Sequence, residues 1–290
     1  MIDLEQVRTF VTVIEAGSFQ SAATRRGIAQ PTVSQHVRKL EDALGRRLVA
    51  RSRTQASPTP EGTRFLPFAR ALLRLAARAE ASLAGGGLAI GASSNIGIYL
   101  LQPFVSAFGP QVSDLGPIDI RIGSNPETAR RLEEAEIDIA LMEWWDGRPG
   151  FDAAVWRDEP VVVIVPPGHP WARRQWIDKT MLMDASLIGG EPGTGTARLL
   201  QERLGIDAAR LKTSLQLGST EAVKQAVRAG LGVSVTLASA VHEEIAAGQL
   251  AAARLRGGRL SKPLYSIVPD HALPRSAARR FAAFLQGKAA

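Results

Sequence analysis

The stretch that most constrains the fold is residues 17–45, GSFQSAATRRGIAQPTVSQHVRKLEDALG, which predicts two short helices joined by a tight turn. Ser18 is placed to cap the first helix, because its hydroxyl can accept a hydrogen bond from a free N–H of the first turn. Gly27 is expected to end that helix. Pro31 suits the first turn of the second helix, where its missing N–H costs nothing. Gly45 suits the left-handed conformation that ends many helices.

The second of these helices has one apolar stripe and several polar faces. The apolar residues recur at intervals of four, three and four, which predicts a buried stripe: Val33, Val37, Leu40 and Leu44. The other faces carry side chains that can reach base edges and phosphates: Thr32, Ser34, Gln35, His36, Arg38 and Lys39. This pattern predicts a helix-turn-helix whose second helix enters the major groove of DNA. On spacing alone, a small helical hairpin with a solvated polar face fits equally well.

The positive charge of the chain is concentrated at this end. Residues 1–87 hold 13 Lys and Arg against 7 Asp and Glu, a balance of +6, whereas residues 88–290 hold 22 against 21, a balance of +1. An arginine-rich composition without a function would spread the excess evenly. The uneven distribution therefore favours phosphate binding at the N-terminal end.

Composition narrows the class of protein. The 290 residues are enough for two domains with cores of their own. There is no cysteine, which excludes disulfides, thiolate metal sites and a cysteine nucleophile. No apolar run reaches the length of a membrane helix, and MIDLEQVRTF does not resemble a signal peptide. We expect no membrane association and a cytoplasmic location.

Three further segments and a hinge complete the N-terminal part of the chain. Residues 3–16 place apolar side chains on one helical face, which is expected to pack behind the helix-turn-helix. Residues 47–59 predict a two-stranded wing whose arginines face the DNA backbone, although a basic surface loop is the alternative. Residues 60–84 predict one long helix with an apolar stripe that needs a partner. Gly85–Gly87 predict a flexible hinge.

From Leu88 onward, strand and helix patterns alternate, which predicts a parallel α/β sheet with covered faces. Strands are expected at 88–92, 118–122, 137–142, 161–165, 186–188, 213–217, 232–236 and 264–268. Helices are expected at 95–108, 126–135, 195–204, 219–229, 237–246 and 274–286. The segment is too long for one small sheet, so we interpret 161–165 and 264–268 as two crossings between two lobes.

Residues 1–62 resemble the DNA-binding domain of LysR-type transcriptional regulators. The resemblance rests on Phe10, Val13, Gly17-Ser18-Phe19, Ala22-Ala23, Gln30-Pro31-Thr32-Val33-Ser34, Leu40-Glu41, Leu44-Gly45, Leu48, Arg51 and Thr59-Pro60-Glu61-Gly62. Ala29, Gly27 and Val49-Ala50 depart from the usual Ser, Leu and Leu/Phe residues of the family. Ordered but looser landmarks continue the resemblance beyond Leu88: Ser94, Gly123–Asn125, Ile137–Leu141, Pro166–Pro170, Glu191–Thr196 and Gly230–Val233.

The resemblance implies an α/β protein with a winged helix-turn-helix at 1–59 and a linker and dimerisation helix with its hinge at 60–87. A two-lobed effector domain like the periplasmic binding proteins is implied at 88–290. Lobe I would comprise 88–162 and 267–290, and lobe II 163–266. The partners implied are double-stranded DNA, a small-molecule effector, a second copy in a homodimer, two more in a homotetramer, and RNA polymerase as a further candidate. No cofactor or metal is expected.

Two sets of residues are assigned to DNA and to the dimer. The residues expected to contact DNA are Gln30, Pro31, Thr32, Ser34, Gln35, Arg38, Arg51 and Arg53. The residues expected at a dimer seam lie on the long helix: Phe65, Phe68, Leu72, Leu73 and Ala76.

Effector binding is expected where loops between the lobes open helices, because free N–H groups and hydroxyls there can hold an anion. The candidates are Ser93, Ser94, Asn95, Asn125, Gly193, Thr194, Thr196, Ser219 and Thr220. The alternative for each is an ordinary helix cap. The family often has Arg where this chain has Gly190 and Ala197, which argues against a carboxylate held by arginine.

Catalysis finds little support. The four histidines, His36, His169, His242 and His271, are widely separated and lack metal-ligand spacing, and His169 fits a structural turn. No nucleophile or nucleotide-binding motif is present. Two other classes are weighed: a binding or transport protein, which would not need a helix-turn-helix, and an enzyme, which would need a reactive group. Trp144-Trp145 could wall the cleft or pack in an interface.

Overall fold

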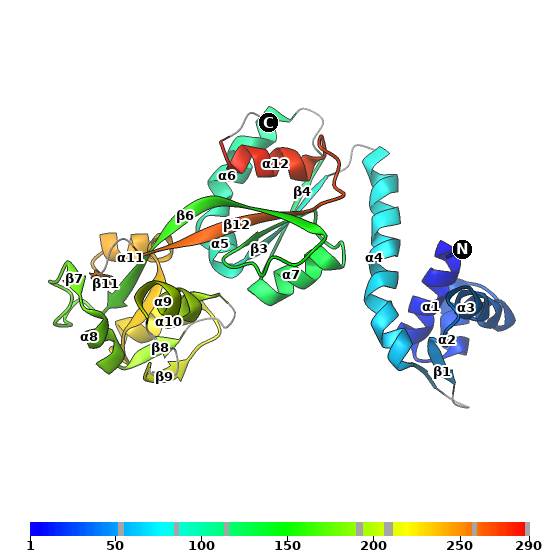
Figure 1. Ribbon diagram of the computed structural model, residues 1–290, viewed down its shortest axis with the longest axis horizontal. Coiled ribbons are helices and arrows are strands. Elements are labelled where there is room, and N and C mark those ends of the chain that lie inside the picture. The colour runs from blue at the N-terminus through cyan, green and yellow to red at the C-terminus, as the bar shows by residue number, and fades with distance from the viewer. Residues whose placement is uncertain are drawn as a thin grey trace. The chain divides into compact units, whose positions relative to one another are not determined.

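A computed structural model gives the fold, which divides into two compact units (Figure 1). One unit is built mainly from Met1–Gly86 and the other mainly from Gly87–Ala290. The structure describes residues 1–51, 55–83, 87–112, 116–189, 194–205, 211–256 and 260–287. Of the predicted hinge Gly85–Gly87, the first two glycines lie outside the described residues.

The N-terminal unit contains the predicted helix-turn-helix. Helix α2 (Phe19–Arg26) begins after Ser18, whose hydroxyl accepts the Ser21 N–H at 3.0 Å, and it ends at Gly27 with φ +64°. Helix α3 (Gln30–Leu44) carries Pro31 in its first turn and ends at Gly45. The remaining elements are α1 (Leu4–Ala16), β1 (Val49–Arg51), β2 (Ala56–Pro58) and α4 (Pro60–Leu83). The predicted wing is confirmed, since β1 and β2 pair antiparallel.

One core joins these elements. Val33, Val37 and Leu40 of α3 are fully buried, as the stripe predicts. The Phe10 ring of α1 lies 5.7 Å from the Phe65 ring of α4, so the start of the long helix packs into the same core. Gly62 is required at this junction, because a Cβ there would lie 2.0 Å from the Leu48 carbonyl oxygen.

The C-terminal unit is built on one continuous sheet. Among the described residues, eight strands form it in the order β4-β3-β5-β12-β6-β11-β7, with β10 also paired to β6. The strands of this sheet are β3 (Leu88–Ser93), β4 (Ile118–Gly123), β5 (Ile139–Met142), β6 (Phe151–Val165), β7 (Trp176–Ile177), β10 (Ser234–Leu237), β11 (Ala251–Leu255) and β12 (Ser261–Pro269). A separate parallel pair is formed by β8 (Leu187–Gly189) and β9 (Thr213–Gln216).

The expectation of a parallel sheet is wrong in part. Strands β3, β4 and β5 are parallel, but β12 runs antiparallel to both β5 and β6, and β10 and β11 run antiparallel to β6. The reason is that β6 and β12 are long strands that pass between the lobes in opposite directions, as the ribbon shows (Figure 1). The predicted crossing segments, 161–165 and 264–268, lie on these two strands, but the crossing itself falls just outside both of them.

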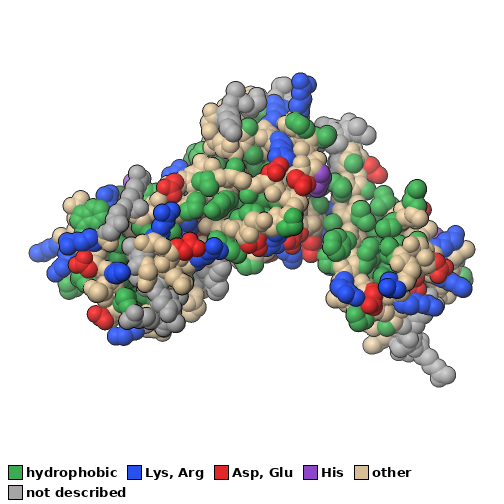
Figure 2. All heavy atoms as spheres, viewed as in Figure 1, with side chains coloured by type: hydrophobic (Ala, Val, Ile, Leu, Met, Phe, Trp, Pro, Cys, Tyr) green, Lys and Arg blue, Asp and Glu red, His purple; other side chains and the backbone are tan. Residues whose placement is uncertain are grey.

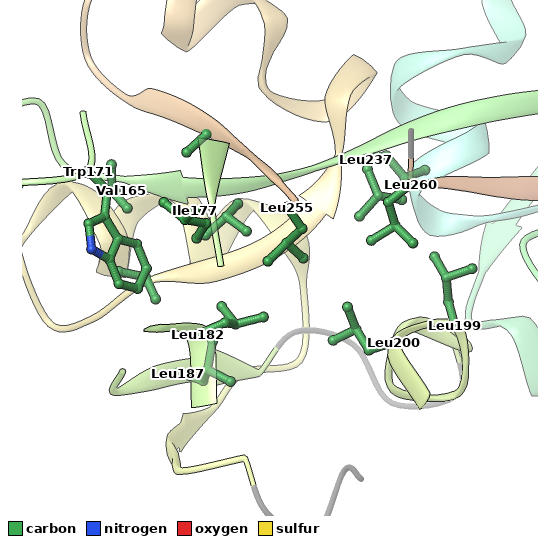
Figure 3. Packing of buried hydrophobic residues seen from close by; sticks show 14 of the residues in the cluster. Val165, Trp171, Ile177, Leu182, Leu187, Leu199, Leu200, Leu237, Leu255 and Leu260 are labelled. Carbon is green, nitrogen blue, oxygen red and sulfur yellow. The ribbon is translucent and has the colours of Figure 1, made fainter. Parts of the chain in front are cut away.

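Separate apolar cores define the two lobes. Lobe I is built on β3, β4, β5 and the adjoining ends of β6 and β12. Its helices are α5 (Ser94–Tyr99), α6 (Leu101–Phe108), α7 (Asn125–Glu133) and α12 (Ala277–Leu285). Lobe II contains β7 to β11, and its helices are α8 (Lys179–Asp184), α9 (Thr196–Leu204), α10 (Thr220–Arg228) and α11 (His242–Ala246). Leucines from several of these elements meet in its core (Figure 3).

Packing places the lobe boundary slightly earlier than expected. Val161 and Leu260 belong to the lobe II core, whereas Leu264 belongs to the lobe I core. The crossing therefore lies where Pro160 pairs with Ser261, rather than after 162 and before 267.

Some elements were not foreseen. The alanine-rich strand β11 and the two-residue strand β7 have weak strand signals, and both are recruited by pairing with β6 and with each other. The helix expected at 95–108 is interrupted at Leu100, which separates α5 from α6. The helix expected at 237–246 begins as the 3₁₀ turn η3 (Ala238–Val241).

No helix in the described ranges is both long and apolar enough to cross a membrane.

On the face shown in Figure 2, basic and acidic side chains are both visible over each lobe.

Candidate nucleic-acid interface and inter-lobe cleft

Helix α3 presents a polar face beside its buried stripe. Gln30, Pro31, Gln35 and Arg38 are exposed, while Thr32 and Ser34 are half-buried. The Gln30 side-chain amide donates to the Ser34 hydroxyl at 3.0 Å, which orders the first turn. Five of these six predicted contact residues therefore lie in the first two turns of the helix, where a recognition helix meets base edges, and the exposed Arg38 lies further along it.

Three other residues considered for DNA contact differ from this group. His36, grouped with the donor-rich side chains, turns toward α1, where its Nδ1 lies 3.0 Å from the Thr9 hydroxyl. Arg51 is the last residue of β1, the first strand of the wing. Arg53 lies outside the described residues.

Glu41 fixes the wing to α3, a role that sequence reasoning did not assign. Its buried carboxylate accepts the N–H groups of Leu48 and Val49 at 2.9 and 3.1 Å, and the Arg47 guanidinium at 3.3 Å. Thr59 holds the other end of the wing, because its hydroxyl donates to the Arg47 carbonyl and accepts the Gly62 N–H. The predicted helix-turn-helix and wing are thus held together as one unit.

The stripe on α4 divides into two faces. Phe65 and Leu73, both predicted at the dimer seam, pack into the core of their own unit. Phe68 remains 68% exposed and Leu75 46% exposed, and Leu72 and Ala76 are half-buried. The apolar face without a partner in the described chain is therefore carried by Phe68, Leu72 and Leu75, one helical turn apart. Both the packed face and the exposed face of α4 have helical periodicity, so their residues cannot be told apart from spacing alone.

The predicted effector loops of the two lobes meet. Asn95, in the first turn of α5 in lobe I, accepts a hydrogen bond on Oδ1 from the Thr220 hydroxyl of α10 in lobe II at 2.6 Å. Ser219 caps α10 through the Ala222 N–H, as the alternative of a plain helix cap requires. Asn95 is buried, so the contact lies between the lobes and away from solvent.

A buried ion pair that sequence reasoning missed lies at the same place. The ammonium of Lys262 lies 2.8 Å from the Glu143 carboxylate, and the two side chains are only 4% and 1% exposed. Glu143 also accepts the side-chain amide of Asn95 at 2.9 Å. Glu143 directly follows β5, at the carboxyl end of a parallel strand, which is a position that could have indicated it. No sequence pattern indicated Lys262 as a site residue, because it lies within the strand β12 and not in a loop that opens a helix.

Lys262 also holds the loop before α9. Its ammonium donates to the Thr194 carbonyl and to the Thr196 hydroxyl, both at 3.0 Å. Of the predicted effector residues in this loop, Thr194 and Thr196 therefore contact the residue that joins the lobes, while Gly193 lies outside the described residues. Arg198, which directly follows Ala197, pairs with Glu202 at 2.6 Å on the surface. The cation of the cleft is therefore a lysine from β12.

The remaining predicted effector residues in lobe I are Asn125, Ser94 and Ser93, and the hydrogen bonds of the first two stay within that lobe. The Asn125 side chain is buried, accepts the Glu143 N–H at 3.0 Å and donates to the Trp144 carbonyl at 2.8 Å. Ser94 donates to the Gly123 carbonyl of its own lobe at 3.1 Å. The hydroxyl of Ser93 is buried and has no hydrogen-bond partner among the described residues.

The two neighbouring tryptophans have different surroundings. Trp144 faces lobe II, where the Arg198 guanidinium lies 5.6 Å from its ring and a Cβ at Gly195 would lie 3.2 Å from its Cβ. Trp145 packs within lobe I, edge-on to the Phe151 ring at 5.7 Å. Trp144 therefore lies at the contact between the lobes, and Trp145 belongs to the core of one lobe.

A second buried cation also contacts both lobes. Lys224 of α10 is buried, pairs with Glu221 at 2.7 Å and Glu244 at 2.5 Å, and lies 4.9 Å from the ring centre of Tyr99 of α5. Burial alone would lower the pKa of Lys224, but the hydrogen bonds to Glu221 and Glu244 outweigh it and raise the pKa. Burial has the opposite effect on Tyr99 and raises its pKa, because it disfavours the charged phenolate. Lys224 therefore stays charged, and the carboxylates of Glu221 and Glu244 balance its charge.

His169 has the structural role expected for it. Its Nδ1 accepts the Trp171 N–H at 3.1 Å, and the two rings meet edge-on at 4.9 Å. Burial lowers the pKa of His169, which favours the neutral ring that this hydrogen bond needs.

Comparison with known proteins finds matches to both parts of the chain. Residues 4–63 match the family of bacterial regulatory helix-turn-helix proteins of the lysR type, and residues 81–290 match the LysR substrate binding domain. The chain is 46% identical over 196 residues to PtxE of Stutzerimonas stutzeri, named as a putative HTH-type transcriptional regulator, covering 68% of this chain and all of that protein. It is 33% identical to the HTH-type transcriptional regulator CbbR of Sinorhizobium medicae, covering 86% of this chain and 81% of that protein.

Solved structures show the same fold. A full-length variant of OxyR from Pseudomonas aeruginosa superposes with a TM-score of 0.70 at 25% identity, covering 99% of this chain and 95% of that chain. CbnR, a LysR family transcriptional regulator, superposes with a TM-score of 0.68 at 21% identity over the full length of both chains.

Proposed function

The chain belongs to the LysR family of transcriptional regulators, and from this premise we propose that α3 reads DNA while a small molecule held between the lobes controls it. The family and the relatives are regulators with a DNA-binding and an effector-binding domain, and they are not enzymes. What remains to be assigned is which residues perform each task and how the copies assemble.

Readout of DNA is assigned to the exposed face of α3. Gln30, Thr32, Ser34 and Gln35 would reach base edges, and Arg38 would contact phosphate together with Arg51 and Arg53 of the wing. Support comes from the accessibility of this face and from the +6 charge of residues 1–87, where 13 basic residues exceed 7 acidic ones. Such contacts release counterions, so binding would weaken as salt rises.

Assembly is assigned to two apolar surfaces. The face of α4 with Phe68, Leu72 and Leu75 would pair with the same face of a second copy in a homodimer. The edge strand β4 exposes Ile120 and Ile122 next to the exposed Ile98 of α5, and this patch would join effector domains into a homotetramer. RNA polymerase is a further proposed partner. The proposed compartment is the cytoplasm, where bacterial DNA lies.

The effector is assigned to the space between the lobes. The observation that carries this assignment is the hydrogen bond between Thr220 and Asn95, because it joins two predicted effector loops from different lobes. A ligand that replaced such contacts would change how the lobes close. Closure would then alter the spacing of the paired domains and the bending of bound DNA, since a ligand shifts a conformational equilibrium by its differential affinity for the two states.

The test is a thermal-shift screen of metabolites on the full chain, followed by calorimetry on variants. Thr196→Ala and Ser94→Ala should each weaken binding of the compound found by ~0.5–3 kcal/mol, the range for one lost hydrogen bond. Thr213→Ala, an exposed threonine on β9 of the same domain, is the matched control and should bind normally. Unchanged affinity in both cleft variants would place the ligand elsewhere.

A further inference from the structure

The buried ion pair of Lys262 and Glu143 lies between the two lobes and not within one of them. Lys262 stands on the crossing strand β12, opposite Glu159 of the other crossing strand, so its position is set by the hinge of the domain. Its side chain reaches Glu143 of lobe I and the Thr194–Thr196 loop of lobe II. The ammonium is therefore a fixed centre shared by both lobes.

The three hydrogen bonds of this ammonium differ in charge. Two go to neutral oxygens, the Thr194 carbonyl and the Thr196 hydroxyl, and one goes to the carboxylate of Glu143. An ammonium has three donors, so its bonding is complete. The Glu143 carboxylate is thus the anionic partner in direct contact with this buried cation, whereas the carboxylate of Glu159, opposite Lys262 on β6, bonds to Arg157 and to the Ser239 N–H.

The Glu143 carboxylate accepts two hydrogen bonds, against the three that the cation donates. The Glu143 backbone N–H is fixed by Asn125, whereas the carboxylate accepts from the Lys262 ammonium and the Asn95 amide. A rotation of the side chain would release both without moving the strand. Asn95 and Lys262 would then present donors to the vacated position, with the Thr220 hydroxyl bonded to Asn95 beside them.

The charge of a ligand that enters here is constrained. A neutral molecule that displaced Glu143 would leave a buried ammonium without a counter-charge, which is strongly unfavourable. A cation would have to displace Lys262, and the bonds from Lys262 to lobe II would be lost with it. An anion restores the charge balance and uses the same donors.

We propose that the effector carries a small anionic group, and that Glu143 holds its position on Lys262 when the effector is absent. This rests on the proposed function, since it concerns the same cleft. The internal carboxylate competes with the effector and so sets the concentration at which the regulator responds.

The test compares the full chain with two cleft variants and one control variant, using phosphate, sulfate and succinate as probes and calorimetry as the readout. Glu143→Gln keeps the shape and an oxygen for Asn95 but gives up the charge. It should bind at least one of these anions about tenfold or more tighter than the unmodified chain, because the anion no longer displaces a charge-assisted hydrogen bond. Lys262→Met should abolish binding. Lys212→Met, at an exposed lysine in the same domain, makes the same change of charge and should leave binding unchanged.

Two outcomes overturn the proposal: no anion binds Glu143→Gln more tightly than the unmodified chain, or Lys262→Met retains the affinity. A test without mutation guards against variants that fail to fold. On the unmodified chain, at least one of the anions should bind more tightly than the dication putrescine and the neutral erythritol. The reverse ranking overturns the proposal.

Failure of this inference can be told apart from failure of the proposed function. A neutral or cationic compound whose binding depends on Thr196 but not on Lys262 would refute the anionic class and leave the cleft assignment standing. A compound that binds with no dependence on Thr196 or Ser94 would refute the cleft itself.

Discussion

A chain carrying both Phe68→Glu and Leu72→Glu should sediment as a monomer and bind its DNA target at least about 100-fold more weakly, because two linked half-site contacts become one. The two glutamates would put charge into the apolar face of α4 that has no partner within the described chain. Phe68 is already 68% exposed, so the substitution should not disturb the monomer fold. Sedimentation velocity and DNA-binding isotherms measure the two effects.

The control places the same charges on the opposite face of the helix. Thr63 and Ala77 are exposed there, and Thr63→Glu with Ala77→Glu should leave assembly unchanged. Phe65→Glu is unsuitable, because the Phe65 ring packs against Phe10 and its loss would damage the domain itself. If the double variant at Phe68 and Leu72 still sediments as a dimer, α4 is not the seam.

Gln35→Ala should lower affinity for the specific DNA site by ~1–3 kcal/mol, the value of one bidentate base contact. Gln35 is exposed on α3, between Ser34 and His36, so its amide is accessible to a base edge. Binding to random DNA should persist, because phosphate contacts supply most of it. Competition isotherms with specific and random fragments separate the two effects.

Arg51→Ala in the wing is the matched comparison. It should weaken specific and random DNA alike and reduce the salt dependence, as expected for a phosphate contact. An equal loss on both kinds of DNA for Gln35→Ala would show that this residue does not read sequence.

The N-terminal half could be predicted almost completely because its signals are local. Ser18, Gly27 and Gly45 set the ends of two helices by rules that operate within a few residues. The spacing of Val33, Val37 and Leu40 is enough to find the buried side of α3. Local rules could not show that Glu41 would turn inward to hold the wing, because its partners Leu48 and Val49 are set by packing.

The cleft could be predicted only in outline. Loops that open helices after strands were found, because Asn95, Thr196 and Thr220 have helix-start signals in their own neighbourhoods. The ion pair that completes the cleft joins residues 119 apart in sequence, and no periodicity links them. The mixed sheet has the same cause, since the direction of β12 depends on which strands flank it in three dimensions.

The most direct test of the account is equilibrium binding of the purified full chain to the DNA upstream of its own gene and to random DNA of equal length. The account predicts tighter binding to the upstream fragment, by a factor of ~10³ or more at physiological salt. The affinity for both fragments should fall steeply as salt rises, because basic residues of the wing and of α3 replace counterions. Equal affinity for the two fragments, or no binding to either at low salt, would contradict it.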